Sequence, residues 1–159
     1  MQTVRVPMES LYEVILLQLE NGGKANLVVT GVSMKPMLTE HRDSVLLAPI
    51  TAKPGPGDIF LYRRNNGQYV LHRLIRNTDQ GYLFCGDNQY TLEHVAPEQL
   101  LAVVDSFTRD GKRIFLTQSM YRMYVFMCVR LFCMRKCYIK IRRLLGRIHR
   151  KTFRRRKRL

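Results

Sequence analysis

The chain has 159 residues, of which 46% are hydrophobic, so it is long enough for one domain with a real core and too apolar to be disordered throughout. No apolar run reaches the roughly 18 residues of a standard transmembrane helix, and we expect no secretory signal peptide. The net charge of +15 is uneven, because acidic and basic residues balance over 1–118 and residues 119–159 contain no acid. We therefore predict a neutral domain over 1–118 and a basic tail over 119–159.

An amphipathic helix is predicted over roughly residues 10–21. Apolar residues recur there at helical spacing, Ser10 with Glu13 fits a capping box at the start, and Gly22-Gly23 supplies the stop. The apolar run 14–17 on its own would also suit a strand. We expect this helix to pack on a sheet.

Strand and turn signals follow from Asn26 to Leu116. The short β-type runs are residues 27–30, 44–47, 59–62, 69–71 and onward, 82–85, 100–107 and 114–116. Turn residues separate them, most clearly at 54–58 and 65–67, and no crossover helix lies between them. The spacing predicts a mainly β, antiparallel domain of six or seven strands.

The basic tail is predicted to form a long amphipathic helix from about Gln118, with a break near Gly146 and a frayed end at 154–158. Three interpretations are open for it: a helix on an anionic membrane surface, non-specific nucleic-acid binding, and a solvated tail or a helix that packs on the domain. We favour the membrane surface over nucleic acid, because the apolar and aromatic share is high for a nucleic-acid arm.

The cysteines do not form a metal-binding pattern. Cys128, Cys133 and Cys137 lie in the tail without an obvious fourth ligand, so we interpret them as apolar helix residues and not as a zinc site. Cys85 falls in a predicted strand, where we expect it to be buried. We expect neither a metal nor a cofactor.

Three segments of the predicted domain carry candidate chemistry. They are residues 31–38 (GVSMKPML), 69–75 (YVLHRLI) and 86–88 (GDN). Ser33 follows a strand, and its hydroxyl needs an adjacent base to act as a nucleophile. His72 is a candidate base, and Asp87 is a candidate for holding the imidazole in the required tautomer. Taken singly, the three suit a turn serine, a packed strand histidine and an Asx turn.

In their order, these segments resemble the signal peptidase I and LexA-like serine peptidase superfamily. Its hallmark is a Ser-Met-x-Pro-x-Leu segment, a Gly-Asp-Ile turn, a strand that carries the base, and a Gly-Asp-Asn segment, and all four occur over roughly residues 25–105. The strand reads His72-Arg73, so the chain is similar to the Ser/His branch of SipW-like, archaeal and eukaryotic-type signal peptidases. The resemblance implies an antiparallel signal-peptidase/LexA-like β fold, here with a short N-terminal helix and a basic amphipathic C-terminal helix.

The resemblance also implies roles for individual residues. Ser33 would be the acyl-forming nucleophile and His72 the general base, then the general acid. Asp87 would orient or stabilise His72, and Glu93 is the nearest candidate for an accessory acid. Lys35 competes as base by proximity, but an imidazole suits base catalysis at neutral pH, whereas a Lys must first be desolvated.

The resemblance further implies an oxyanion hole that includes the backbone N–H of Ser33. Gly31 stands where some members carry a hydroxyl donor, so a second donor would come from the backbone, from Thr30 or from another group. Met34 would shape the turn beside the substrate.

Two features of the superfamily are not evident here. The N-terminal residues 1–24 resemble neither a membrane anchor nor a DNA-binding domain, and no Ala-Gly autocleavage site precedes Ser33. We expect a bacterial serine endopeptidase, cytoplasmic or peripheral at a membrane, that cleaves an extended peptide or protein substrate. The alternative is a non-catalytic peptide-binding or scaffold module that the basic tail tethers to membrane or nucleic acid.

Overall fold

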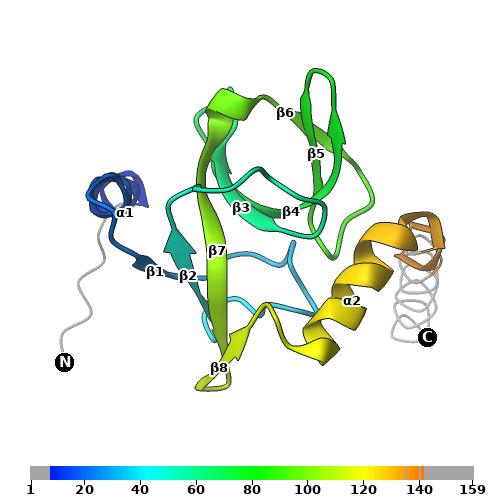
Figure 1. Cartoon of the computed structure of the whole chain (residues 1–159). Coiled ribbons are helices and arrows are strands. Elements are labelled where there is room, and N and C mark those ends of the chain that lie inside the picture. The colour runs from blue at the N-terminus through cyan, green and yellow to red at the C-terminus, as the bar shows by residue number, and fades with distance from the viewer. Residues whose placement is uncertain (1–7, 135, 140, 142–159) are drawn as a thin grey trace, which may run out of the picture.

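A computed structural model of the chain describes residues 8–134, 136–139 and 141 (Figure 1). Helix α1 spans Met8–Glu20, helix α2 spans Ser119–Arg130, and a short 3-10 helix covers Pro97–Gln99. The strands are β1 (Ala25–Val28), β2 (Ser44–Ala48), β3 (Ile59–Arg63), β4 (Tyr69–Thr78), β5 (Gly81–Cys85), β6 (Glu93–Val95), β7 (Leu100–Arg109) and β8 (Lys112–Phe115). The predicted class is confirmed: the chain is mainly antiparallel β with few helices.

The strands form one sheet in the order β1-β2-β7-β3-β4-β5-β6, and β8 pairs with β7. Every pairing is antiparallel, and register shifts interrupt three of them, at Leu46/Leu47, Leu61/Tyr62 and Leu74/Arg76. Such irregularities bend strands and increase their twist. In Figure 1 the β3–β6 part of the sheet accordingly lies above and beside the β1–β2 part, and α1 and α2 lie on opposite sides of the molecule.

The central strand β3 is buried on both faces. Its odd-numbered apolar residues pack in a larger core with α1, β1 and β2, and its even-numbered residues pack in a smaller core with Phe84 and Val95. Alternate residues of a strand point to opposite faces, so a continuous apolar run suits a strand between two cores. The neighbours His72 and Arg73 on β4 are separated in the same way.

The predicted end of the first helix is confirmed, and its predicted start is wrong. The chain leaves α1 through Gly22, whose φ is +74°, and the N–H of Gly23 donates to the carbonyl of Gln18 at 3.0 Å, as in a Schellman motif. The helix includes Met8, so Ser10 lies within it and does not cap it.

Strand β6 was not predicted from the sequence. Three residues are too few to show an alternating pattern, and only the pairing with β5, in which Glu93 lies opposite Phe84, defines this strand. Its position matters for the site, because it brings Glu93 beside β5 and β4.

Helix α2 packs on the domain. Tyr121 and Cys128 on its inner face are buried, and helical conformation occurs again at 132–134 and 136–139. Over the described part of the predicted tail, one face of the helix therefore packs on the domain. The predicted break near Gly146 and the frayed end lie outside the described residues. Among the helices that are described, none has the length and apolarity needed to cross a membrane.

Candidate active site

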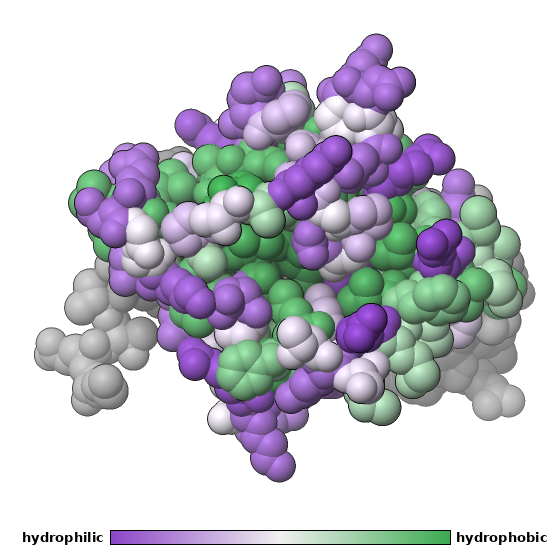
Figure 2. Space-filling view, viewed as in Figure 1, coloured by the Kyte–Doolittle hydropathy of each residue, from purple (hydrophilic) through white to green (hydrophobic). Residues whose placement is uncertain are grey.

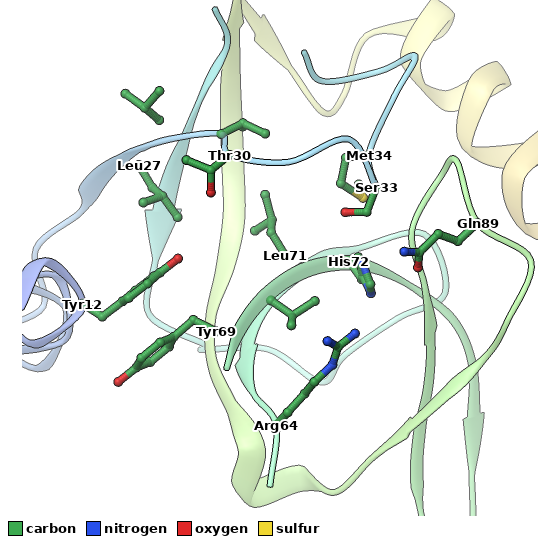
Figure 3. A pocket seen from close by; sticks show the side chains of 13 residues that line it. Tyr12, Leu27, Thr30, Ser33, Met34, Arg64, Tyr69, Leu71, His72 and Gln89 are labelled. Atoms are coloured by element: carbon green, nitrogen blue, oxygen red, sulfur yellow. The ribbon is translucent and has the colours of Figure 1, made fainter. Parts of the chain in front are cut away.

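A cleft of about 230 Å³ lies beside the free edges of β1 and β4 (Figure 3). β1 is the terminal strand of the sheet, and β4 pairs with β5 only from Arg73 onward, which leaves its first half open on that side. The cleft is lined by Tyr12, Leu27, Val28, Val29, Thr30, Ser33, Met34, Arg64, Tyr69, Val70, Leu71, His72 and Gln89. Tyr12 and Tyr69 stack at one end, with ring centroids 3.9 Å apart.

Ser33 and His72 lie at the other end of the cleft, and Gly86 lies against both. A methyl group on the α-carbon of Gly86 would be 3.0 Å from Cβ of Ser33 and 3.1 Å from Nε2 of His72. Cβ of Ser33 and Nε2 of His72 are therefore no farther apart than about twice that spacing. The structure thus brings the predicted nucleophile and base together, with Nε2 as the ring nitrogen on the Ser33 side.

The Gly-Asp-Asn segment holds the Ser33 loop through its backbone. The N–H of Asn88 donates to the carbonyl of Ser33 at 2.7 Å, and the side-chain amide of Asn88 donates to the carbonyl of Val32 at 3.3 Å. The competing base Lys35 forms an ion pair with Glu40 at 3.1 Å and does not line the cleft. The geometry therefore favours His72 over Lys35.

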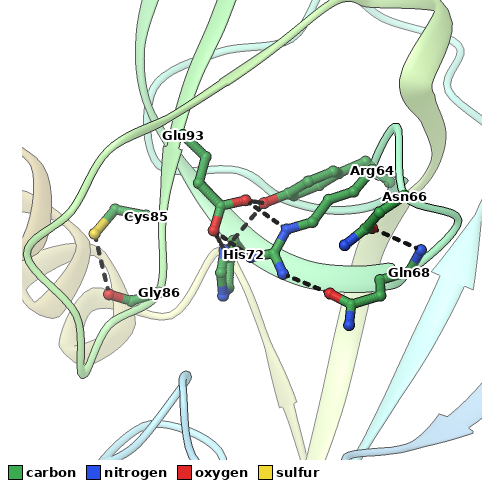
Figure 4. Close-up of polar contacts among 8 residues, drawn as sticks. Arg64, Asn66, Gln68, His72, Cys85, Gly86 and Glu93 are labelled. Carbon is green, nitrogen blue, oxygen red and sulfur yellow. Dashed lines mark hydrogen bonds and ion pairs between the residues drawn. The ribbon is translucent and has the colours of Figure 1, made fainter.

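Three side chains fix the other ring nitrogen of His72 (Figure 4). Nδ1 lies 3.1 Å from the Tyr62 hydroxyl, which donates its one proton to Glu93 at 2.7 Å, and Glu93 also accepts hydrogen bonds from Arg64. Since the Tyr62 proton goes to Glu93, its oxygen accepts from N–H at Nδ1. We assign the tautomer from this network. It leaves Nε2 unprotonated, as a general base requires.

Burial keeps the imidazole of His72 neutral at neutral pH. Burial lowers the pKa of His72 to about 4. The negative charges of Glu93 and Asp87 raise this pKa, and the positive charge of Arg64 lowers it further. Burial alone would raise the pKa of Glu93, but hydrogen bonds from Arg64 and Tyr62 hold it below its usual range. Burial and Glu93 raise the pKa of Tyr62, so the phenol keeps its proton.

The pKa of His72 sets the expected acid limb of acylation. If His72 is the base, the rate at which a serine-directed probe acylates Ser33 should fall with a midpoint near pH 4, because the imidazole is neutral above that pH. An exposed histidine would give a midpoint near 6.5. Protonation also favours the unfolded chain, so the free energy of unfolding should fall by about 1.4 kcal/mol per pH unit between about pH 6.5 and 4.

Rate measurements against pH and urea unfolding at each pH test this expectation. The His72→Gln variant should lose the pH-dependent stability in that window. A rate midpoint near 6.5 in the wild type would contradict the burial of the base.

Asp87 has a different partner from the one expected. Its carboxylate accepts hydrogen bonds from Nε and Nη2 of Arg73 at 2.9 and 2.8 Å, and from the hydroxyl of Tyr124 at 3.0 Å. The acid in the network that fixes Nδ1 of His72 is Glu93, the predicted accessory acid. Asp87 influences His72 through its charge, and its hydrogen bonds stabilise the buried guanidinium.

Of the two residues predicted beside the substrate and the oxyanion, Met34 lines the cleft and Gly31 does not. Met34 is buried and lines the cleft beside Ser33, as expected. Gly31 is exposed and does not line the cleft, and its φ of +84° explains a glycine in this turn. Thr30 lines the cleft with its hydroxyl directed inward (Figure 3). Thr30 is therefore better placed than Gly31 to donate a second hydrogen bond to the oxyanion.

Sequence reasoning missed Tyr62 and Arg64, although a signal for Tyr62 was present. The turn at 65–67 sets the β3–β4 register, in which Phe60 lies opposite His72. Tyr62, two residues along β3, is therefore on the same face and diagonal to His72. The three-residue loop 65–67, with Gly67 at a φ of +85°, produces this register, whereas a two-residue turn at 66–67 would place Tyr62 on the opposite face.

The cysteines lie where the sequence suggests. Cys85 and Cys128 are buried, and Cys133 and Cys137 are exposed on the helical segment after α2. Within the described ranges, no group of His, Cys, Asp and Glu side chains is arranged to hold a metal ion.

Comparison with known proteins adds no relative. A scan against protein-family models and a search of the curated proteins found no match to this chain. The signal-peptidase resemblance therefore depends on the motif residues, and the function is inferred from the geometry of the site.

Proposed function

We propose that the protein is a serine endopeptidase of the signal-peptidase-like Ser/His type, with Ser33 as nucleophile and His72 as general base. One observation carries the proposal: Ser33 and Nε2 of His72 converge on Gly86 in the cleft while Nδ1 is held by Tyr62. A histidine that only packs within a strand would not require a serine beside Nε2, the ring nitrogen that Tyr62 does not contact.

The free edge of β1 supports an extended peptide as the substrate. Val29 directs both its backbone groups toward the β2 side, accepting from the N–H of His41 and donating to the carbonyl of Asp43. Backbone groups alternate sides along a strand, so those of Val28 and Thr30 point to the cleft. A peptide in the cleft can pair with them as an added strand.

The first half of β4 offers a second edge. Leu74 directs both its backbone groups toward the β3 side: its N–H donates to the carbonyl of Asp58, and its carbonyl accepts from the N–H of Gly57. By the same alternation, the backbone groups of Tyr69 and Leu71 point to the cleft. A peptide between the two edges would be held along both sides, with its scissile carbonyl directed to Ser33.

The proposed chemistry uses the chain's own groups. Oγ of Ser33 attacks the carbonyl carbon while Nε2 of His72 takes its proton, and the N–H of Ser33 stabilises the oxyanion. The imidazolium then protonates the leaving amine, and water releases the acyl group with His72 again as base. Glu93 and Asp87 offset the positive charge that forms on the ring.

Active-site labelling of the purified full-length protein tests the proposal. A serine-directed acylating probe should label the wild type and should fail to label Ser33→Ala and His72→Ala. Ser44→Ala on β2, outside the cleft, is the matched control and should be labelled normally.

Two results would contradict the proposal. One is labelling that persists in Ser33→Ala. The other is a well-folded wild type that is not labelled but binds extended peptides, which would favour the non-catalytic peptide-binding module.

A further inference from the structure

Helix α2 directs an apolar face away from the domain. Met120, Met123 and Phe126 have 74%, 55% and 57% of their surface exposed, whereas Tyr121 and Cys128 on the inner face are buried. A surface helix normally presents polar side chains to water and apolar ones to the core. Here both faces are apolar, and the domain covers only one of them.

The exposed apolar surface continues beyond the end of α2. We define the outer face as Met120, Met123, Phe126, Met127, Leu131 and Met134, all of which are exposed. In Figure 2 apolar side chains reach the surface at the right of the view, over α2. Exposed apolar side chains gathered on one helical segment mark an interaction site more often than scattered single residues do.

The charged residues on the helix that carries the outer face are all basic. Arg122 and Arg130 on α2 are exposed, and residues 119–159 contain no acidic residue while they account for the whole net charge of +15. Apolar side chains flanked by Lys and Arg suit the interface of an anionic bilayer, where both are stabilised.

Other occupants match the face less well. Nucleic acid would contact the basic residues but leave the methionines and Phe126 in water. A second copy of the chain would bring two strongly positive segments together. We infer that the outer face of α2 binds the surface of an anionic lipid bilayer, with the helix lying in the plane of the interface.

The attachment of α2 makes this contact orient the whole domain. Tyr121 accepts a hydrogen bond from Arg73 at 3.0 Å, and Tyr124 donates to Asp87, next to Gly86. A helix fixed in this way cannot rotate independently of the cleft. Binding to a bilayer therefore sets the direction from which a membrane-associated peptide reaches Ser33.

Vesicle co-sedimentation of the full chain tests the inference. The wild type should bind vesicles that contain phosphatidylglycerol, bind pure phosphatidylcholine weakly, and bind less as salt increases. The double variant Met123→Gln/Phe126→Gln should bind at least about tenfold more weakly. Leu17→Gln, at a side chain on α1 that is 61% exposed, is the matched control and should bind as the wild type does.

A spectroscopic measurement reports insertion directly. The chain contains no Trp, so Phe126→Trp places a single indole on the outer face. Its emission should shift to shorter wavelength with anionic vesicles, and the emission of Leu17→Trp should not.

Several results would overturn the inference. The first is equal binding of the wild type to neutral and anionic vesicles, and the second is unchanged vesicle binding of the double variant. The third is a chain that does not bind vesicles but binds DNA, where salt weakens the DNA binding and the double variant retains it. Self-association that the double variant abolishes, again without vesicle binding, would assign the face to a second copy.

Discussion

Replacing Gly86 with Ala is expected to lower the rate of Ser33 acylation by about a hundredfold or more, the size of effect that an ångström-scale misplacement of a catalytic group can have. The new methyl group would lie 2.7 Å from the carbonyl oxygen of Ser33, which is backbone and cannot rotate away. The Ser33 loop would have to move, and the methyl group would also crowd Cβ of Ser33 and Nε2 of His72.

Gly55→Ala is the matched control for this variant. Its new methyl group would be 3.4 Å from Asp58, an ordinary contact, so labelling should stay near the wild-type rate. Probe labelling and thermal unfolding of both variants check the prediction. A wild-type rate in Gly86→Ala would show that Ser33 and His72 do not converge on this glycine.

Arg73→Met is expected to reduce the free energy of unfolding by about 3–5 kcal/mol, because it leaves the carboxylate of Asp87 buried without its guanidinium. Arg73 is completely buried, and besides Asp87 it donates to the carbonyl of Gly57 at 2.7 Å and to Tyr121. A loss of this size is a large part of the stability of a typical domain.

Urea unfolding measures this loss, and two further variants define its origin. Lys24→Met removes one partner of the exposed pair with Asp105 and should cost at most about 1 kcal/mol. Arg73→Met/Asp87→Leu removes both buried charges and should recover part of the loss. Equal effects of Arg73→Met and Lys24→Met would contradict the burial of the Arg73 pair.

Local signals made most of the fold predictable. The alternating and apolar runs, with glycine and proline turns between them, define seven of the eight strands, and Gly22 defines the end of α1. The three-residue β6 is too short for such a signal. The order of strands in the sheet depends on pairings between distant segments, for which the sequence alone gives no pattern.

The candidate site was predictable in its members more than in its contacts. The structure places Ser33 and His72 against the same glycine, Gly86. Which acid supports His72 depends on the faces of β4 and on the position of β6. Because His72 and Arg73 point to opposite faces, Asp87 pairs with Arg73, and Glu93 is left for the His72 side.

The contacts of α2 also bear on how the protein is made. Tyr121 and Tyr124 are translated after all eight strands, yet they complete the hydrogen bonding of the Arg73–Asp87 pair inside the domain. A nascent chain that has emerged only to residue 118 still lacks these two hydroxyls. Until α2 has left the ribosome, the buried Arg73–Asp87 pair therefore lacks two of its hydrogen-bond partners, and the packing beside Gly86 is incomplete.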